Sequence, residues 1–167
     1  MRTAILTIST SVAAGEAEDV SGPTLAELAA SAGAEIIAHE VLPDDRHAIE
    51  QALRRHSAPE ANTPLVFTTG GTGLTPDDVT PEATRAVIER EAPGFAEALR
   101  AESSHHTPLG ILTRGVSGIA GRTLIINFPG NPKAIRELFP VIAPTLEHVV
   151  ATLQRESGRG HHDRHHH

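Results

Sequence analysis

A stretch rich in glycine and threonine, residues 68–83, has the residue types and spacing to bind phosphate beside a divalent metal ion. Glycines let the backbone turn tightly and present bare N–H groups to an anion, and threonines add hydroxyl donors. Asp78 follows a few residues later, where it could hold a cation that bridges to a bound phosphate. The stretch therefore predicts nucleotide or phosphate chemistry. The candidate cradle consists of Thr69, Gly70, Gly71, Thr72 and Gly73.

The glycine loop matches neither of two common phosphate-binding motifs. It lacks the Gly-Lys-Ser/Thr ending of a Walker A loop, and its spacing is wrong for a dinucleotide fingerprint. A tight turn between a strand and a helix explains the glycines equally well, and Asp78 could be an ordinary turn or cap residue. Asp77 would satisfy the same chemistry as Asp78. The added carboxylates and threonines favour the cradle.

Two other polar turns follow strand-like segments. Asp44 comes directly after residues 35–42, and the turn 128–132 comes after residues 122–127. Both turns have a structural explanation, since Asp44 or Asp45 can cap a helix and Pro132 can begin one. In the functional interpretation, Asp44 supplies a second carboxylate for phosphoryl or nucleotidyl transfer, and the later turn binds an anionic or polar group at a helix N-terminus.

Apolar runs alternate with helical patterns along the chain. Alternating strands and helices predict an α/β fold: a three-layer α/β/α sandwich whose mostly parallel sheet has helices on both faces. Because ligands bind at the carboxyl ends of such strands, the loops at 42–45, 70–73 and 127–132 should share one rim. Strands are expected at 4–9, 35–42, 65–67 and 122–127, with an edge strand in 115–121; helices are expected at 22–33, after 44–45, at 80–91 with Thr80 as its cap, at 95–103 and at 132–153.

Composition narrows the class of protein. The formal charge of −7 and the aromatic content of 2% argue against a nucleic-acid binder, which needs cations and stacking platforms. The absence of Cys excludes disulfides and thiolate chemistry and fits a reducing cytoplasm. No apolar run approaches 18 residues, and the first residues form a strand pattern too short for a signal peptide. We therefore expect a cytoplasmic protein that binds neither nucleic acid nor membrane.

The domain organisation is expected to be simple. Residues 1–155 show no internal repeat and no linker, which predicts a single domain. Residues 156–167 hold five of the 11 histidines and are expected to form a disordered tail, either natural or derived from a purification tag. The tail is left out of the functional interpretation.

The glycine loop at 69–73, together with Asp78-Val79-Thr80-Pro81-Glu82-Ala83, resembles the signature of the molybdopterin-binding MogA/MoaB family. The resemblance spans nearly all of residues 3–153. It departs in one place, because the family often has Ser-Asp after the first strand, whereas this chain has Ser9-Thr10-Ser11. The resemblance also includes Ser21-Gly22, Pro43-Asp44, Pro93-Gly94-Phe95, residues 113–118 and residues 127–133.

The resemblance implies a homotrimer that uses Mg²⁺ and ATP to adenylylate molybdopterin, releasing pyrophosphate. The product would then receive molybdate from a molybdate-inserting enzyme. On this basis Asp44 and Asp78 would be the catalytic and metal-binding residues. The substrate- and nucleotide-binding residues would be Ser9, Thr69, Gly70, Gly71, Thr72, Gly73, Ser117, Pro129, Gly130, Asn131 and Pro132.

Two other functions stay open from the sequence. Loss of the acidic residue at position 10 favours a non-catalytic molybdopterin carrier or assembly protein, whereas retention of both Asp44 and Asp78 favours the enzyme. A scaffold that kept the fold and lost the ligand would carry apolar residues such as Val141 and Val149 for subunit contacts.

Overall fold

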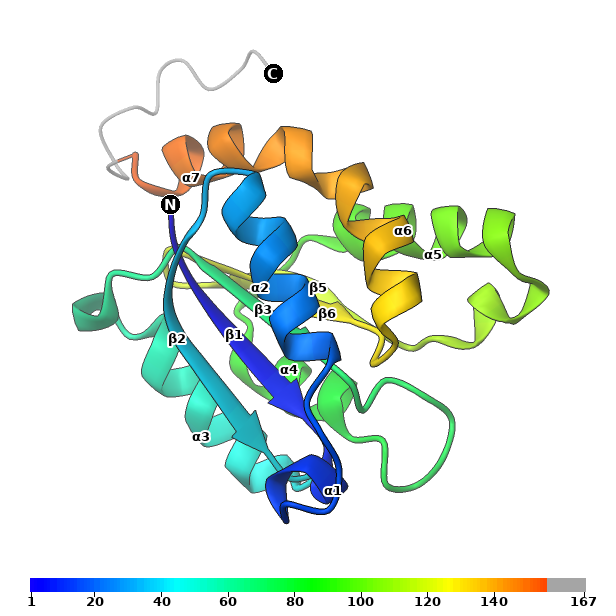
Figure 1. Cartoon of the computed structure of the whole chain (residues 1–167). Coiled ribbons are helices and arrows are strands. Elements are labelled where there is room, and N and C mark those ends of the chain that lie inside the picture. Colours follow the sequence, from blue (N-terminus) through cyan, green and yellow to red (C-terminus); the bar gives the residue numbers. More distant parts are fainter. Residues whose placement is uncertain (156–167) are drawn as a thin grey trace.

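The computed structural model describes residues 1–155, which form a sheet of six strands in the order β2-β1-β3-β6-β5-β4 (Figure 1). The pairs β1–β2, β1–β3 and β3–β6 are parallel, and β5 runs antiparallel to both β6 and β4. Four parallel strands therefore end at the same edge. The strands are β1 (Arg2–Ile8), β2 (Glu35–Leu42), β3 (Leu65–Thr69), β4 (Arg90–Glu91), β5 (Ser117–Ala120) and β6 (Thr123–Phe128).

Helices cover both faces of the sheet. One face carries α2, α5, α6 and α7, and the opposite face carries α3 and α4 (Figure 1). The helices are α1 (Thr10–Ala13), α2 (Ser21–Ser31), α3 (Arg46–Ser57), α4 (Thr80–Val87), α5 (Pro93–His106), α6 (Pro132–Ile142) and α7 (Leu146–Leu153), with 3₁₀ turns η1 (Pro59–Ala61), η2 (Pro108–Leu112) and η3 (Ala143–Thr145). In the described residues, no helix combines the length and the apolarity needed to cross a membrane.

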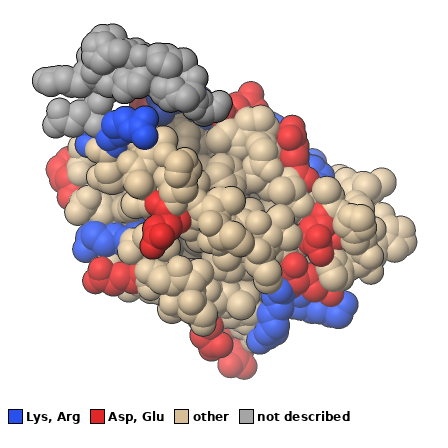
Figure 2. All heavy atoms as spheres, turned by 90° about the horizontal axis from the view of Figure 1, so that it is seen from above, with Lys and Arg blue, Asp and Glu red and all other residues tan. Residues whose placement is uncertain are grey.

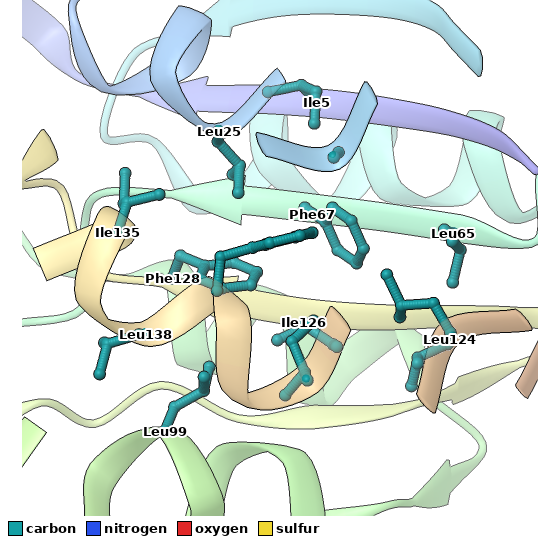
Figure 3. Packing of buried hydrophobic residues seen from close by; sticks show 14 residues of the cluster. Ile5, Leu25, Leu65, Phe67, Leu99, Leu124, Ile126, Phe128, Ile135 and Leu138 are labelled. Atoms are coloured by element: carbon teal, nitrogen blue, oxygen red, sulfur yellow. The ribbon is translucent and has the colours of Figure 1, made fainter. Parts of the chain in front are cut away.

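The strands alternate between two aliphatic cores, because successive side chains of a strand point to opposite faces. In β3, Phe67 packs under α6, whereas its neighbour Val66 faces α3 and α4. Phe67 and Phe128 make an edge-to-face contact with ring centroids 5.6 Å apart, within the cluster shown in Figure 3. The two cores fix the direction of each strand and hence the position of the loop that follows it.

The predicted three-layer α/β sandwich with a mostly parallel sheet is confirmed. A strand does form within 115–121, but its prediction as an edge strand was wrong, because β5 pairs with β6 on one side and with β4 on the other. The short helix α1 was not predicted. The helix expected at 80–91 ends at Val87, because the chain then becomes extended and β4 joins β5. The predicted tail at 156–167 lies outside the described residues.

Thr80 is not the cap of α4, so that prediction was wrong. Val79 occupies the cap position without a side-chain hydrogen bond, and Thr80 is the first helical residue. Its buried hydroxyl instead donates to Gly70 O at 3.0 Å, and its N–H donates to Gly71 O at 3.1 Å. Thr80 thus ties the helix to the glycine loop.

Candidate active site

The loops after β2, β3 and β6 meet at the carboxyl edge of the sheet, as the sequence predicted, and the loop after β1 joins them. Ser9 N donates to Leu42 O at 2.8 Å, which joins the ends of β1 and β2. Gly70 N donates to Phe128 O at 3.1 Å, which joins the ends of β3 and β6. These backbone bonds place the glycine loop between the loop that carries Asp44 and the turn before α6.

The first two glycines of the loop are required by close approach and by backbone conformation. Gly70 and Gly71 have φ values of +102° and +69°, in the left-handed region that side chains disfavour. A side-chain carbon at Gly70 would collide with Ile8 O, and one at Gly71 would collide with the Thr80 hydroxyl. The loop can therefore press against β1 and α4 only because these positions lack side chains.

Two hollows, each of about 400 Å³, open on either side of the glycine loop. They share four residues, Gly70, Gly71, Asp78 and Gly130. The first hollow continues over Ser9 and Asp44, which follow β1 and β2, over Asp19 before α2, and over Pro132 at the start of α6. The second continues over Thr72, Gly73, Leu74, Leu112 and Pro129. Asp78 therefore stands where the two hollows meet.

Each candidate carboxylate is held through one oxygen by a threonine. Asp44 Oδ2 accepts from Thr10 N at 3.1 Å and from Thr10 Oγ1 at 3.0 Å. Asp78 Oδ2 accepts from Thr75 N at 3.1 Å and from Thr75 Oγ1 at 2.8 Å. Asp45, not Asp44, caps α3 by accepting from Ala48 N at 3.1 Å. Within residues 1–155, Oδ1 of Asp44 and of Asp78 has no protein donor, so it is available to a ligand.

The donor set of the two aspartates fits Mg²⁺ bound together with a nucleotide. Carboxylate oxygens are hard ligands, and Mg²⁺ is usually held by one or two carboxylates plus substrate phosphates. No group of three or more His, Cys, Asp or Glu side chains that could hold a metal ion occurs in the described part of the chain. The site therefore suits a metal that arrives with phosphates better than a metal held by protein alone.

Arg114 fixes the far side of the glycine loop, a role that the sequence did not reveal. Its guanidinium donates to Gly73 O at 2.7 Å, to Asp78 O at 2.6 Å and to Glu82 Oε2 at 2.7 Å. The hydrogen bond from Arg114 lowers the pKa of Glu82, and the same bond raises the pKa of Arg114. The protein's own carbonyls and Glu82 therefore use these guanidinium donors.

The turn before α6 contributes to the rim in three ways. Asn131 caps α6, accepting from Lys133 N at 2.8 Å and from Ala134 N at 3.3 Å. The buried Thr69 hydroxyl donates to Pro129 O at 2.7 Å, so it links two loops rather than facing a ligand. Lys133 is exposed and pairs with Glu137 at 3.0 Å. The turn is thus preorganised by its own hydrogen bonds.

Ser117 lies apart from the two hollows. It is buried in β5, where its hydroxyl donates to Ala92 O at 2.6 Å and accepts from Ala96 N at 3.1 Å. These bonds anchor the first turn of α5. Of the other predicted site residues, Thr69 is buried at the end of β3 and Asn131 caps α6, and the rest line a hollow.

The net charge of the protein does not favour an anionic ligand, so any such ligand depends on groups at the site itself. Figure 2 shows the face away from the carboxyl ends of β1 and β2, where acidic and basic side chains are dispersed among uncharged residues. With a formal charge of −7, the protein would not attract an anion from a distance. An anionic ligand must be held by the N–H groups and hydroxyls of the rim and by any cation that binds with it.

Known proteins resemble this chain over most of its length. A family model described as a probable molybdopterin binding domain matches residues 4–148. The molybdopterin adenylyltransferase of Escherichia coli strain K12 is 42% identical over 152 residues, covering 90% of this chain and 77% of that protein. The molybdenum cofactor synthesis protein cinnamon of Drosophila melanogaster is 41% identical over 87% of this chain, which spans only 24% of that protein.

A solved structure has the same fold. The molybdopterin biosynthesis enzyme MoaB from Thermus thermophilus superposes with a TM-score of 0.85 and 41% sequence identity. The match covers 91% of this chain and 95% of that one. The strand order and the helical layers are therefore shared over nearly the whole described chain.

Proposed function

The chain belongs to the molybdopterin-binding MogA/MoaB family, and we propose that it is a molybdopterin adenylyltransferase of molybdenum cofactor biosynthesis. The reaction joins the AMP moiety of ATP to molybdopterin and releases pyrophosphate. The relatives at about 40% identity support this activity, since the chain aligns with most of the length of the bacterial ones.

The observation that carries the proposal is that two hollows meet at the glycine loop and at Asp78. Adenylyl transfer needs two ligands whose phosphates come together in line. The terminal phosphate oxygen of molybdopterin would attack the α-phosphorus of ATP. A new P–O bond would form there as the bond to the β-phosphate breaks and pyrophosphate leaves. Such chemistry depends on positioning and charge stabilisation more than on covalent catalysis.

Some residues of the rim would bind phosphate oxygens, and others would hold the metal ion. The N–H groups of Gly71 and Gly73 would bind phosphate oxygens, whereas Gly70, whose N–H donates to Phe128 O, and Thr72 would support their loop. The free oxygens of Asp78 and Asp44 would hold Mg²⁺ together with the ATP phosphates. The bound ion would offset the charge that develops on the departing pyrophosphate.

Release of pyrophosphate tests the proposal directly. The wild type should release pyrophosphate from ATP only when both Mg²⁺ and molybdopterin are present. Asp78→Asn should reduce turnover by about 100-fold or more, since even the outer partners of metal ligands typically contribute 10–100-fold. Asp77→Asn is the matched control, because Asp77 is exposed and lines neither hollow among the described residues. It should keep nearly wild-type turnover.

Binding measurements separate the remaining outcomes. Molybdopterin binding without any pyrophosphate release would identify a carrier or assembly protein instead of an enzyme. Failure to bind either molybdopterin or ATP would refute the functional proposal altogether. Equal losses in Asp78→Asn and Asp77→Asn would refute the role given to Asp78.

We also propose, from the family resemblance, that the protein is a cytoplasmic homotrimer that passes its product to a molybdate-inserting enzyme. Light scattering of the purified chain would test the trimer. A mass close to that of one 17.6-kDa chain would contradict it.

A further inference from the structure

Thr10 and Asp44 form a reciprocal pair across two loops. The Thr10 side chain and N–H both donate to Asp44 Oδ2, at 3.0 and 3.1 Å. In return, Asp44 N donates to Thr10 Oγ1 at 2.9 Å. The two residues are 34 positions apart, one after β1 and the other after β2. The single hydroxyl of Thr10 thus acts as donor and acceptor at once.

The pair decides which way the Asp44 carboxylate faces. With Oδ2 held by Thr10, Oδ1 lies 3.2 Å from the point that a side-chain carbon of Gly71 would occupy. That oxygen therefore faces the glycine loop. Without the Thr10 hydroxyl, Asp44 Oδ2 would keep only the bond from Thr10 N, so the half-buried Asp44 carboxylate would turn away from the glycine loop more easily.

The Thr10 hydroxyl both donates to Asp44 and accepts from it, which a carboxylate at this position could not do. An ionised acid at position 10 could accept from Asp44 N, but it has no proton to donate to Asp44 Oδ2. It would also place a second negative charge beside the first. The change from acid to threonine therefore converts a pair of like charges into a hydrogen-bonded unit with one charge.

We propose that Thr10 is a positioning residue for the adenylyl transfer reaction: it orients Asp44 Oδ1 toward the glycine loop without contacting the substrates itself. This inference rests on the proposed function. It explains how the chain can lack the acid at position 10 and still hold Asp44 for catalysis.

Four variants measured together test the inference: Thr10→Ser, Thr10→Val, Asp44→Asn and the double variant Thr10→Val with Asp44→Asn. Serine keeps the hydroxyl, whereas valine keeps the branched shape and loses it. Thr10→Val should lower the kcat of pyrophosphate release about tenfold, as outer partners of metal ligands typically do. The KM for ATP should stay within about twofold, and Thr10→Ser should keep at least about half of the wild-type kcat.

The double variant separates positioning from a general structural effect. If Thr10 acts through Asp44, valine should cause almost no further loss once Asp44 is asparagine, so the two effects should not add. Single-turnover reactions with excess enzyme keep the slow variants measurable. Thermal denaturation checks that Thr10→Val remains folded, which its exposed position favours.

The possible outcomes are distinct. Equal loss in Thr10→Ser and Thr10→Val, or an equal factor of loss from valine in both backgrounds, would overturn the positioning role while leaving the proposed function intact. A wild type that releases no pyrophosphate with molybdopterin present would overturn the proposed function and, with it, this inference.

Discussion

Replacing Arg114 by methionine should disorder the far side of the glycine loop. The change removes the hydrogen bonds to Gly73 O and Asp78 O and the ion pair with Glu82, while it keeps an unbranched apolar stem. Hydrogen bonds to a charged group contribute about 1.5–3 kcal/mol, and solvent screening reduces this because 34% of the Arg114 side chain is exposed. We take about 1 kcal/mol for each carbonyl and about 0.5 kcal/mol for the ion pair.

These contributions predict that about 2–3 kcal/mol of the anchoring of the loop is lost in Arg114→Met. If the loop must be in place for turnover, the rate should fall about 30- to 140-fold, since each 1.4 kcal/mol corresponds to a factor of ten. The assay is pyrophosphate release with saturating Mg²⁺-ATP and molybdopterin. Thermal denaturation of the same samples would report how much of the loss comes from global unfolding.

Glu82→Gln is the matched control, because it removes the ion pair and keeps Arg114 on the two carbonyls. It should reduce turnover less than about threefold. If Glu82→Gln is as damaging as Arg114→Met, the ion pair and not the carbonyl contacts holds the loop. If Arg114→Met has nearly wild-type turnover, the anchoring role argued from the structure is refuted.

Two other changes test the edge strand and the glycine loop. The pKa of Glu40 is lowered, chiefly by hydrogen bonds from Arg55, so their pairing should stabilise the fold fully above the ordinary pKa of 4.5 and lose this effect as the pH falls through the lowered value. Denaturant unfolding should show Glu40→Gln less stable by about 1 kcal/mol at pH 7, with the difference shrinking below pH 4.5; a gap that widens in acid would contradict this. Gly71→Ala should lower thermal stability by at least about 1 kcal/mol because of its φ of +69° and the collision with Thr80. Gly94→Ala, where a side-chain carbon would meet open space, should not have this effect, and equal losses at both glycines would refute the steric argument.

The fold could be predicted largely because the sheet is buried on both faces. The run Leu124-Ile125-Ile126 is apolar without interruption, and it lies in the central strand β6, whose residues are all buried. Shorter features depended on distant partners. Thr80 has the residue type of a helix cap, but its hydroxyl finds Gly70 O ten positions earlier, and local preference cannot show that choice. The four-residue helix α1 was missed because it buries no residue and so leaves no periodic pattern.

The candidate site was predictable where residue type alone decides what a loop can do. Glycines that approach another backbone and an aspartate after them are visible in the sequence, and the structure brings Asp78 and Asp44 to one rim. Thr10 and Arg114 were not assigned to the site, because the partner of Thr10 lies 34 positions away and those of Arg114 lie 32 to 41 positions away. Two of the Arg114 partners are backbone carbonyls, which every residue carries and which therefore leave no mark in a sequence.

The first hollow already carries several carboxylates, so a further acid at position 10 would increase the electrostatic repulsion of an anionic ligand. Glu18, Asp19, Asp44 and Asp78 line this hollow, and no Lys or Arg is among its described lining residues. A triphosphate that enters the hollow meets like charges that only backbone N–H groups and a divalent cation can offset. A fifth carboxylate would add repulsion, whereas Thr10 adds a donor. We therefore expect Thr10 to suit the proposed nucleotide binding better than an acid at this position would.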